Sequence, residues 1–113
     1  MPGTFHLHKS ADGQFRFTLE AGNGLALLLS EPFPAKSAAL AGVAAVRLGV
    51  ARETAFEPLT GEDGHPYFLL RSVDGALLGH SQRFASAVGC RLGMDSVRRH
   101  APDAELLDET PRP

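Results

Sequence analysis

The strongest constraint on this chain is that its sequence repeats. A shift of 51 positions aligns residues 5–54 with residues 56–105 without a gap. The matches extend from the first residues of each copy into its last third, and they share one offset. We therefore identify a tandem duplication, a pattern that fixes the architecture before any local prediction. Identical pairs include Phe5 and Phe56, Gly13 and Gly64, Phe17 and Phe68, Gly24 and Gly75, Ser30 and Ser81, Phe33 and Phe84, and Gly42 and Gly93.

The size of one copy predicts that the two copies share a core. A unit of about 50 residues buries too little apolar surface to be stable alone. The whole chain has 113 residues, of which 43% are hydrophobic, enough for one core. We therefore predict a single domain over residues 1–108, built from repeat one (5–54) and repeat two (56–105). Residues 109–113 read as a disordered tail.

Each copy has the pattern of three strands, one helix and a closing strand. Apolar and polar residues alternate in residues 4–9 and 15–20, with turns at Asp12-Gly13 and at Gly22 to Gly24. Residues 25–29 form the third strand, and repeat two follows with strands in 67–71 and 76–80. A helix then carries an apolar stripe in each copy, Ala39, Val43, Val46 and Val50 in the first and Ala87, Cys90, Met94 and Val97 in the second. Ser86 is a good N-cap, Ala35 is not, and Pro102 ends the second helix before a closing strand in 104–107.

Two segments resemble the repeat of the YegP-like family. One is residues 15–24, Phe-Arg-Phe-Thr-Leu-Glu-Ala-Gly-Asn-Gly, followed by Ser30, Glu31 and Phe33. The other is residues 93–105, from Gly-Met-Asp-Ser-Val-Arg-Arg to Asp-Ala-Glu. The resemblance implies an α+β fold: two β-β-β-α-β units form one antiparallel sheet, exchange their C-terminal strands and pack their helices on the sheet. It supplies no catalytic residues, because the family is functionally uncharacterised.

Charge and cysteine content argue against several classes of protein. The formal net charge is −2, whereas nucleic-acid binders usually carry a basic excess. The basic cluster Arg98, Arg99 and His100 falls at a predicted helix end, where cations offset the helix dipole. One cysteine cannot form an intrachain disulfide, and the first residues lack the apolar run of a signal peptide. We expect a cytoplasmic protein that binds no membrane.

No residue cluster in the sequence predicts catalysis, a metal or a cofactor. His6 and His8 project from one strand face, but a metal site usually needs a third ligand, so we read them as solvated side chains. Cys90 lies in an apolar stripe, which favours a buried thiol over a nucleophile paired with His80 or His100. The helix glycines Gly42 and Gly93 each cost about 1 kcal/mol of helix propensity. We interpret them as points where a helix closely approaches the sheet or the other helix.

The sheet face away from the helices is the candidate binding surface. Alternation places polar or exposed apolar residues there, and an apolar patch rimmed by arginines often marks a partner surface. The alternative is that some of these residues lie under a loop or at a strand edge. The predicted patch consists of Arg16, Leu28, Tyr67, Leu69, Arg71 and Leu77.

Three functions remain open at this point. The leading hypothesis is a non-enzymatic binding module with an unknown protein partner, or one that forms a homo-oligomer. The alternative is a binder of a small molecule or nucleic acid that uses the same face. An enzyme that uses His80, His100 or Cys90 is third.

Overall fold

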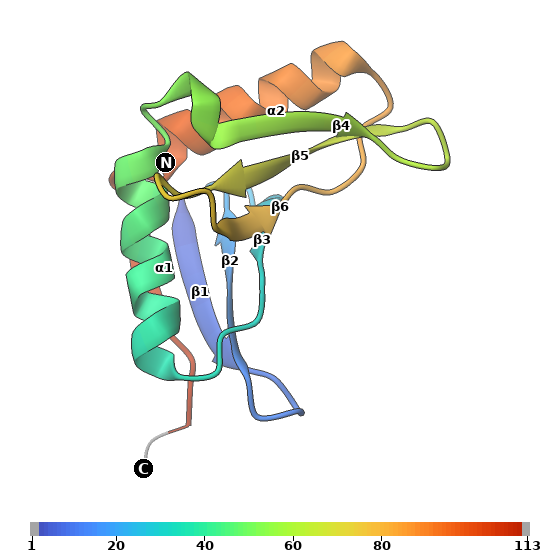
Figure 1. Cartoon of the computed structure of the whole chain (residues 1–113). Helices are drawn as coiled ribbons and strands as arrows, with labels where there is room; N and C mark the ends of the chain where they lie inside the picture. The colour runs from blue at the N-terminus through green and yellow to red at the C-terminus, as the bar shows by residue number, and fades with distance from the viewer. Residues whose placement is uncertain (1–2, 112–113) are drawn as a thin grey trace.

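A computed structural model describes residues 3–111 as two copies of the predicted unit in one sheet (Figure 1). The observed elements agree with the predicted ones to within about two residues at most ends. In chain order they are β1 (Thr4–Lys9), β2 (Phe15–Glu20), β3 (Ala26–Ser30), α1 (Lys36–Gly49), a short 3₁₀ turn (Glu53–Ala55), β4 (Phe56–Thr60), β5 (Pro66–Arg71), β6 (Leu77–His80), α2 (Ala87–His100) and β7 (Glu105–Asp108).

The seven strands form one sheet in the order β4-β5-β6-β3-β2-β1-β7. The two copies join where β3 and β6 pair antiparallel, with Leu29 opposite His80. These two residues are equivalent in the repeat, so an approximate twofold axis passes through their pair. The predicted α+β class, with two repeats in one sheet, is confirmed; the sheet is mixed and not wholly antiparallel as expected, because β7 pairs parallel to β1.

The closing strand crosses to the other copy and makes the sheet mixed. The neighbouring pairs through β4-β5-β6-β3-β2-β1 are antiparallel, but β7 pairs parallel to β1, with Phe5 opposite Leu106. The repeat-one counterpart of β7 is residues 54–57. This segment runs directly into β4, so the closing strand of one copy is merged with the first strand of the next. The exchange therefore places a separate strand beside β1 but not beside β4.

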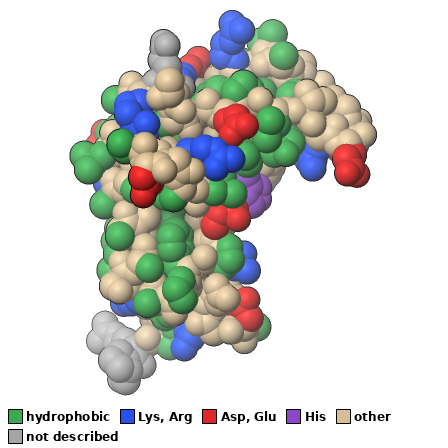
Figure 2. Space-filling model, viewed as in Figure 1, with side chains coloured by type: hydrophobic (Ala, Val, Ile, Leu, Met, Phe, Trp, Pro, Cys, Tyr) green, Lys and Arg blue, Asp and Glu red, His purple; other side chains and the backbone are tan. Residues whose placement is uncertain are grey.

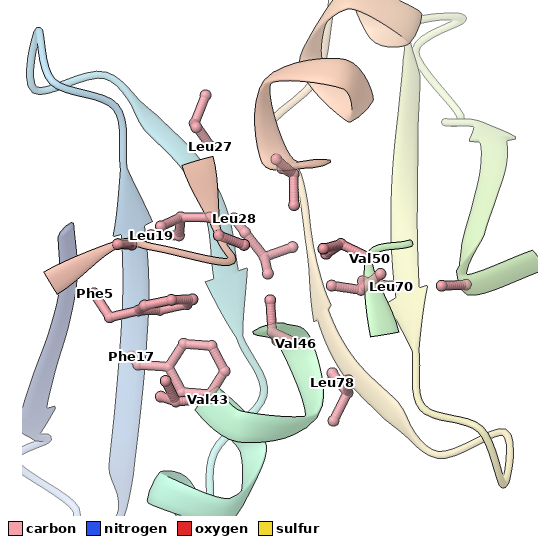
Figure 3. Close-up of a cluster of buried hydrophobic side chains, with 14 of the residues drawn as sticks. Phe5, Phe17, Leu19, Leu27, Leu28, Val43, Val46, Val50, Leu70 and Leu78 are labelled. Carbon is pink, nitrogen blue, oxygen red and sulfur yellow. The ribbon is translucent and has the colours of Figure 1, made fainter. Parts of the chain in front are cut away.

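Both helices cover the same face of the sheet and run roughly across one another (Figure 1). Helix α1 packs on β2 and reaches β6 of the other copy, while α2 packs on β5 and reaches β3. Ser86 caps α2 by accepting the Gly89 N–H at 3.1 Å, and Ala35 gives α1 no side-chain cap. Side chains from both copies meet in one buried cluster, where Val46 and Leu28 lie near Leu70 (Figure 3). The predicted shared core is thus observed.

A phenyl ring explains each helix glycine. A Cβ on Gly42 would lie 2.7 Å from Cζ of Phe33, and one on Gly93 would lie 2.5 Å from Cζ of Phe84. Each ring belongs to the segment between the third strand and the helix, and it stacks on Phe17 or Phe68 of the sheet. The close approach is therefore helix against aromatic ring, with the sheet beneath the ring.

One buried serine in each copy completes the hydrogen bonding at the sheet centre. The Ser30 hydroxyl accepts the Phe17 N–H at 2.8 Å and donates to the Glu31 carbonyl at 2.9 Å. Ser81 repeats this with the Phe68 N–H at 2.9 Å and the Gln82 carbonyl at 2.8 Å. Both serines are buried. The hydroxyl thus replaces a backbone partner where the strand pairing stops.

Hydrogen bonds continue past residue 108. The Glu109 N–H donates to the Leu7 carbonyl at 2.8 Å, and the Thr110 N–H donates to Asp108 at 2.9 Å. The remainder of the predicted tail, residues 112–113, lies outside the described residues. Among residues 3–111, no helix is long and apolar enough to cross a membrane.

Replacing either buried serine by alanine should destabilise the fold. In Ser30→Ala the buried Phe17 N–H loses its acceptor, which costs about 1–3 kcal/mol of unfolding free energy. Ser81→Ala should cost a similar amount, because the Phe68 N–H is placed identically. Urea denaturation measures both. Exposed Ser37→Ala is the control and should stay within about 0.5 kcal/mol of wild type; equal stability of all three variants would contradict the assigned role.

Candidate functional site

Five of the six predicted patch residues lie on the face away from the helices, which we call the open face. Their neighbours Phe68 and Leu70 are buried on the helix side, so strand alternation turns Tyr67, Leu69 and Arg71 outward. These three side chains are half-buried, as are those of the other two members. The five are Arg16, Tyr67, Leu69, Arg71 and Leu77.

The prediction for Leu28 was wrong. Leu28 is fully buried in the core, as Figure 3 shows, and pairs with Leu19 on the helix side of the sheet. The register of β2 and β3 shifts between Leu19 and Glu20. Such a bulge adds one residue to a strand and reverses the inward and outward alternation beyond it. The outward residue is therefore Leu29, which pairs with Thr18.

Leu29 belongs to a continuous row across the centre of the open face. Its cross-strand partner is His80, and the partner of His80 on the other side is Leu69. Cross-strand neighbours of this kind contact one another directly. The row therefore places one leucine on each side of a histidine at the junction of the copies. The sequence analysis did not include Leu29 and His80 in the predicted patch. The sequence feature that links them is the 51-residue shift, which makes the two positions equivalent.

The charged groups of the open face are largely neutralised by neighbours. Arg71 Nε donates to Glu57 at 2.9 Å, and His80 Nδ1 lies 3.2 Å from Glu31. Arg16 donates to the Ser10 hydroxyl at 2.9 Å, and its Nη2 lies 3.8 Å from Asp12. The two predicted rim arginines therefore present compensated charge to a partner.

The structure does not bring all predicted residues together. Arg16 and Tyr67 occupy equivalent positions, on β2 and β5, and two strands separate them. Arg83 lies over the Tyr67 ring at 4.6 Å from its centroid, which covers part of the aromatic surface. Leu77 pairs with Arg71 and stays near Leu69. The contiguous members of the predicted patch are therefore Leu69, Arg71 and Leu77, and Leu69 adjoins His80 and Leu29 of the row.

His6 lies on the same face over repeat one. Its Nε2 is 3.3 Å from Glu20 and its Nδ1 is 3.3 Å from Glu109, so two carboxylates bracket the imidazole. Residues 3–111 contain no group of three or more His, Cys, Asp or Glu side chains arranged to hold a metal ion. His6 is therefore a hydrogen-bonded histidine that links Glu109 to β1.

Cys90 is buried and far from both candidate bases. Only 2% of its surface is exposed, and burial raises the pKa of its thiol. His80 lies on the open face, whereas Cys90 is a buried residue of α2 on the opposite side of the sheet. His100 is ten residues further along α2, about 15 Å by helical rise, and its Nδ1 is 2.7 Å from the Ser96 carbonyl oxygen. The thiol is thus neutral and unassisted at neutral pH.

A second candidate site is a hollow of about 570 Å³ between α2 and the β4–β5 hairpin, which we call the β4 hollow. In repeat one, Phe15 and Lys36 occupy the positions of Pro66 and Ala87, and Lys36 binds Asp108 of the closing strand at 2.5 Å. Repeat two has smaller side chains there and no closing strand beside β4. The lining residues are Pro58, Leu59, Thr60, Pro66, Ala87, Cys90, Arg91 and Met94.

These features define a tandem-repeat α+β protein with an open sheet face, and the comparisons with known proteins agree with this class. The chain belongs to the family described as "Domain of unknown function (DUF1508)", which matches residues 10–57 and 62–108. The predicted YegP-like resemblance is therefore confirmed.

Relatives of similar length match almost the entire chain. UPF0339 protein PA0329 of Pseudomonas aeruginosa is 42% identical over 97% of this chain and 100% of its own length. UPF0339 protein YegP of Escherichia coli is 38% identical with the same coverage. The solution structure of E. coli YegP, titled a protein of unknown function, has a TM-score of 0.93, with 37% identity over 100% of this chain and 97% of that one. That of SO3888 from Shewanella oneidensis has a TM-score of 0.92, with 32% identity over 97% and 93%.

The burial of Cys90 predicts a slow thiol. Alkylation by iodoacetamide at neutral pH should be on the order of a hundredfold slower in the folded protein than in urea, because reaction requires local opening and a deprotonated sulfur. Mass spectrometry of the alkylated fraction against time measures the ratio. Ala44→Cys, at an exposed position on α1, provides a matched reactive control. Similar rates at the two sites would show that the thiol is accessible.

Proposed function

We propose that this chain is a cytoplasmic, non-enzymatic binding module that captures a protein partner on its open face. The observation that supports this most is the row Leu69, His80 and Leu29 at the centre of that face. Partly buried leucines at a sheet centre, with charged residues around them, resemble the apolar core and polar rim of an interface. The single free thiol suits a reducing compartment.

The charge pattern favours a protein over a nucleic acid. Phosphate binding depends on cations that are free to replace counterions. Arg71 is bound to Glu57, and Arg16 lies near Asp12, so each arginine carries a carboxylate beside it. A partner with a neutral, apolar surface can cover these pairs without breaking them. Weak dependence of binding on salt follows from this arrangement.

The separation of the reactive groups supports a role without catalysis. Nucleophilic catalysis needs a thiol and a base within hydrogen-bonding reach. Cys90, His80 and His100 lie apart, and each histidine has a hydrogen-bond partner of its own. The chemistry these side chains offer is therefore hydrogen bonding and packing.

Aspartate substitutions on the open face should abolish capture. Leu69→Asp combined with Leu77→Asp places two carboxylates in the apolar centre, where desolvating them opposes binding. We expect at least about a tenfold loss of the partner recovered by crosslinking from host lysate, quantified by mass spectrometry. Circular dichroism should show an unchanged fold.

Leu25→Asp is the matched control for this experiment. Leu25 is an exposed leucine beside α2, on the helix side of the molecule. The control should retain the partners that the wild type captures. Equal recovery by the wild type and the double variant would remove the open face from consideration.

A second candidate function, binding of a small apolar acid, is favoured by the β4 hollow. Its volume falls in the range of ligand pockets, roughly 300–1,000 Å³. The lining is mainly apolar, and Arg91 supplies a cation for a carboxylate. In repeat one, the larger side chains of Phe15 and Lys36 occupy the equivalent place.

Octanoate is a suitable probe of the β4 hollow. Titration should give saturable amide shifts for Leu59, Cys90 and Met94 in NMR spectra. Pro66→Phe, which copies Phe15 of repeat one, should fill the hollow and remove these shifts, while Leu25→Asp retains them. Shifts that persist unchanged in Pro66→Phe would place the probe elsewhere and exclude this function.

A further inference from the structure

The sheet has two edges, and they end differently. At one edge, the closing strand β7 pairs in parallel with β1, with Asp108 opposite Leu7. At the other edge, β4 has no neighbour beyond it among residues 3–111. The difference shows in one pair of equivalent residues, because Leu7 is fully buried whereas Pro58 is exposed. The β4 edge therefore offers the place that β7 fills beside β1.

The β4 hollow is the counterpart of the space between β7 and α1. In repeat one, Asp108 lies opposite Leu7, whose side chain is buried on the helix side, and it binds Lys36 of α1. The residues equivalent to Leu7 and Lys36 are Pro58 and Ala87, and both line the β4 hollow. In Figure 2, hydrophobic side chains are exposed in the upper part of the molecule, where β4 and α2 lie. A strand beside β4 would direct its helix-side residues into this hollow.

The backbone of β4 directs hydrogen-bonding groups to this edge. The Phe68 N–H is bound on the β6 side, so Pro58, which lies opposite Phe68, makes no ladder bond to β5 and its carbonyl points outward. The equivalent carbonyl of Leu7 accepts the Glu109 N–H of the closing segment at 2.8 Å. Because the direction alternates along a strand, the N–H and C=O of Phe56 also point outward. These groups can pair with an added strand.

Pro58 argues against a second copy as the occupant of the β4 edge. Proline has no N–H, so it is tolerated at a sheet edge and removes one bond from any ladder formed there. Two copies that paired through their β4 strands would bring two prolines into one short ladder and lose a bond at each. An extended segment of another protein loses only one. The edge therefore favours a foreign segment over self-association.

Arg91 gives the β4 hollow a cation for an acidic segment. Its side chain is exposed there, and among residues 3–111 no carboxylate pairs with it. Arg98 of the same helix, in contrast, is bound to Asp95 at 3.0 Å. Arg91 lies one helical turn after Ala87, the position of Lys36 in repeat one, so its longer side chain serves the same region. The ion pair that holds β7 to α1 thus has its counterpart in Arg91 and an acidic residue of the added segment.

We infer that the β4 edge binds an extended segment of a partner protein, paired in parallel in the register that β7 takes on β1. The segment carries an apolar residue and, two positions later, a carboxylate, as Leu106 and Asp108 do in β7. Its apolar side chain lies at the Met94 end of the β4 hollow, and its carboxylate meets Arg91. This inference rests on the second candidate function, because it takes the same hollow as a binding site and specifies the apolar acid as part of a peptide.

The acetylated hexapeptide Ala-Glu-Leu-Leu-Asp-Glu, the sequence of residues 104–109, is a probe with this pattern. In an NMR titration of the full chain it should shift the amides of Phe56, Leu59 and Arg91. Arg91→Glu should lower the affinity at least about fivefold, whereas Arg99→Glu, at an exposed position of the same helix, should bind like wild type. A peptide with Lys in place of Asp should prefer the Arg91→Glu variant. Shifts confined to β1, or shifts at β4 that grow with protein concentration alone, overturn the inference.

Methylation of single peptide nitrogens separates strand pairing from binding in the hollow alone. In β7 the N–H groups of Glu105 and Glu109 donate to the β1 segment, so the N–H of Leu107, between them, points the same way and that of Leu106 points away. N-methylation of the second leucine of the probe should therefore lower the affinity at least about tenfold, and N-methylation of the first should change it little. Equal affinities of the two methylated peptides overturn the inference. Octanoate shifts that persist in that case leave the second candidate function intact, and loss of both removes the hollow as a site.

Discussion

The β3–β6 junction is the interaction on which the rest of this structure depends. Its ladder has two residue pairs, Leu29 with His80 and Ser30 with Gly79, and the Glu31 N–H donates to the Leu78 carbonyl at 3.1 Å beside it. A Cβ on Gly79 would lie 2.6 Å from the Leu29 carbonyl oxygen, so the strands approach too closely there for any other residue. The hydroxyls of Ser30 and Ser81 add hydrogen bonds within their own copies, to the Phe17 and Phe68 N–H groups. The two copies are therefore joined by few backbone bonds at this junction, by the β7–β1 pair and by the core.

That core makes the copies mutually dependent. Each helix packs on its own sheet half and also reaches the central strand of the other copy. A copy expressed alone would expose the apolar side of its helix and the edge of its third strand, and a unit of about 50 residues has little burial to spare. Because the junction and the core constrain the buried residues, the two copies are free to differ mainly in their surfaces. The β4 hollow is one such difference, because Phe15 and Lys36 occupy the equivalent place in repeat one.

The sequence predicted the fold closely because period-two alternation, glycine turns and the constant 51-residue shift all agree. The prediction failed where one extra residue in a strand reversed the inward and outward alternation. The bulge at Leu19 and Glu20 moved Leu28 into the core and Leu29 outward, and nothing in the local alternation marks a bulge. The parallel β7–β1 pair was also missed, because pairing direction depends on where the chain returns in space. The separation of Arg16 from Tyr67 could have been predicted from the sequence. The 51-residue shift makes these residues equivalent and therefore places them on opposite sides of the twofold axis.

The positions of the two proposed binding sites have a physical consequence. The open face lies on one side of the sheet, and the β4 hollow lies on the opposite side, between α2 and the β4–β5 hairpin. A partner on the open face therefore leaves the hollow uncovered. The two sites bind independently unless the occupant of one changes the sheet that lies between them, because coupling requires that each ligand distinguish two states of the protein.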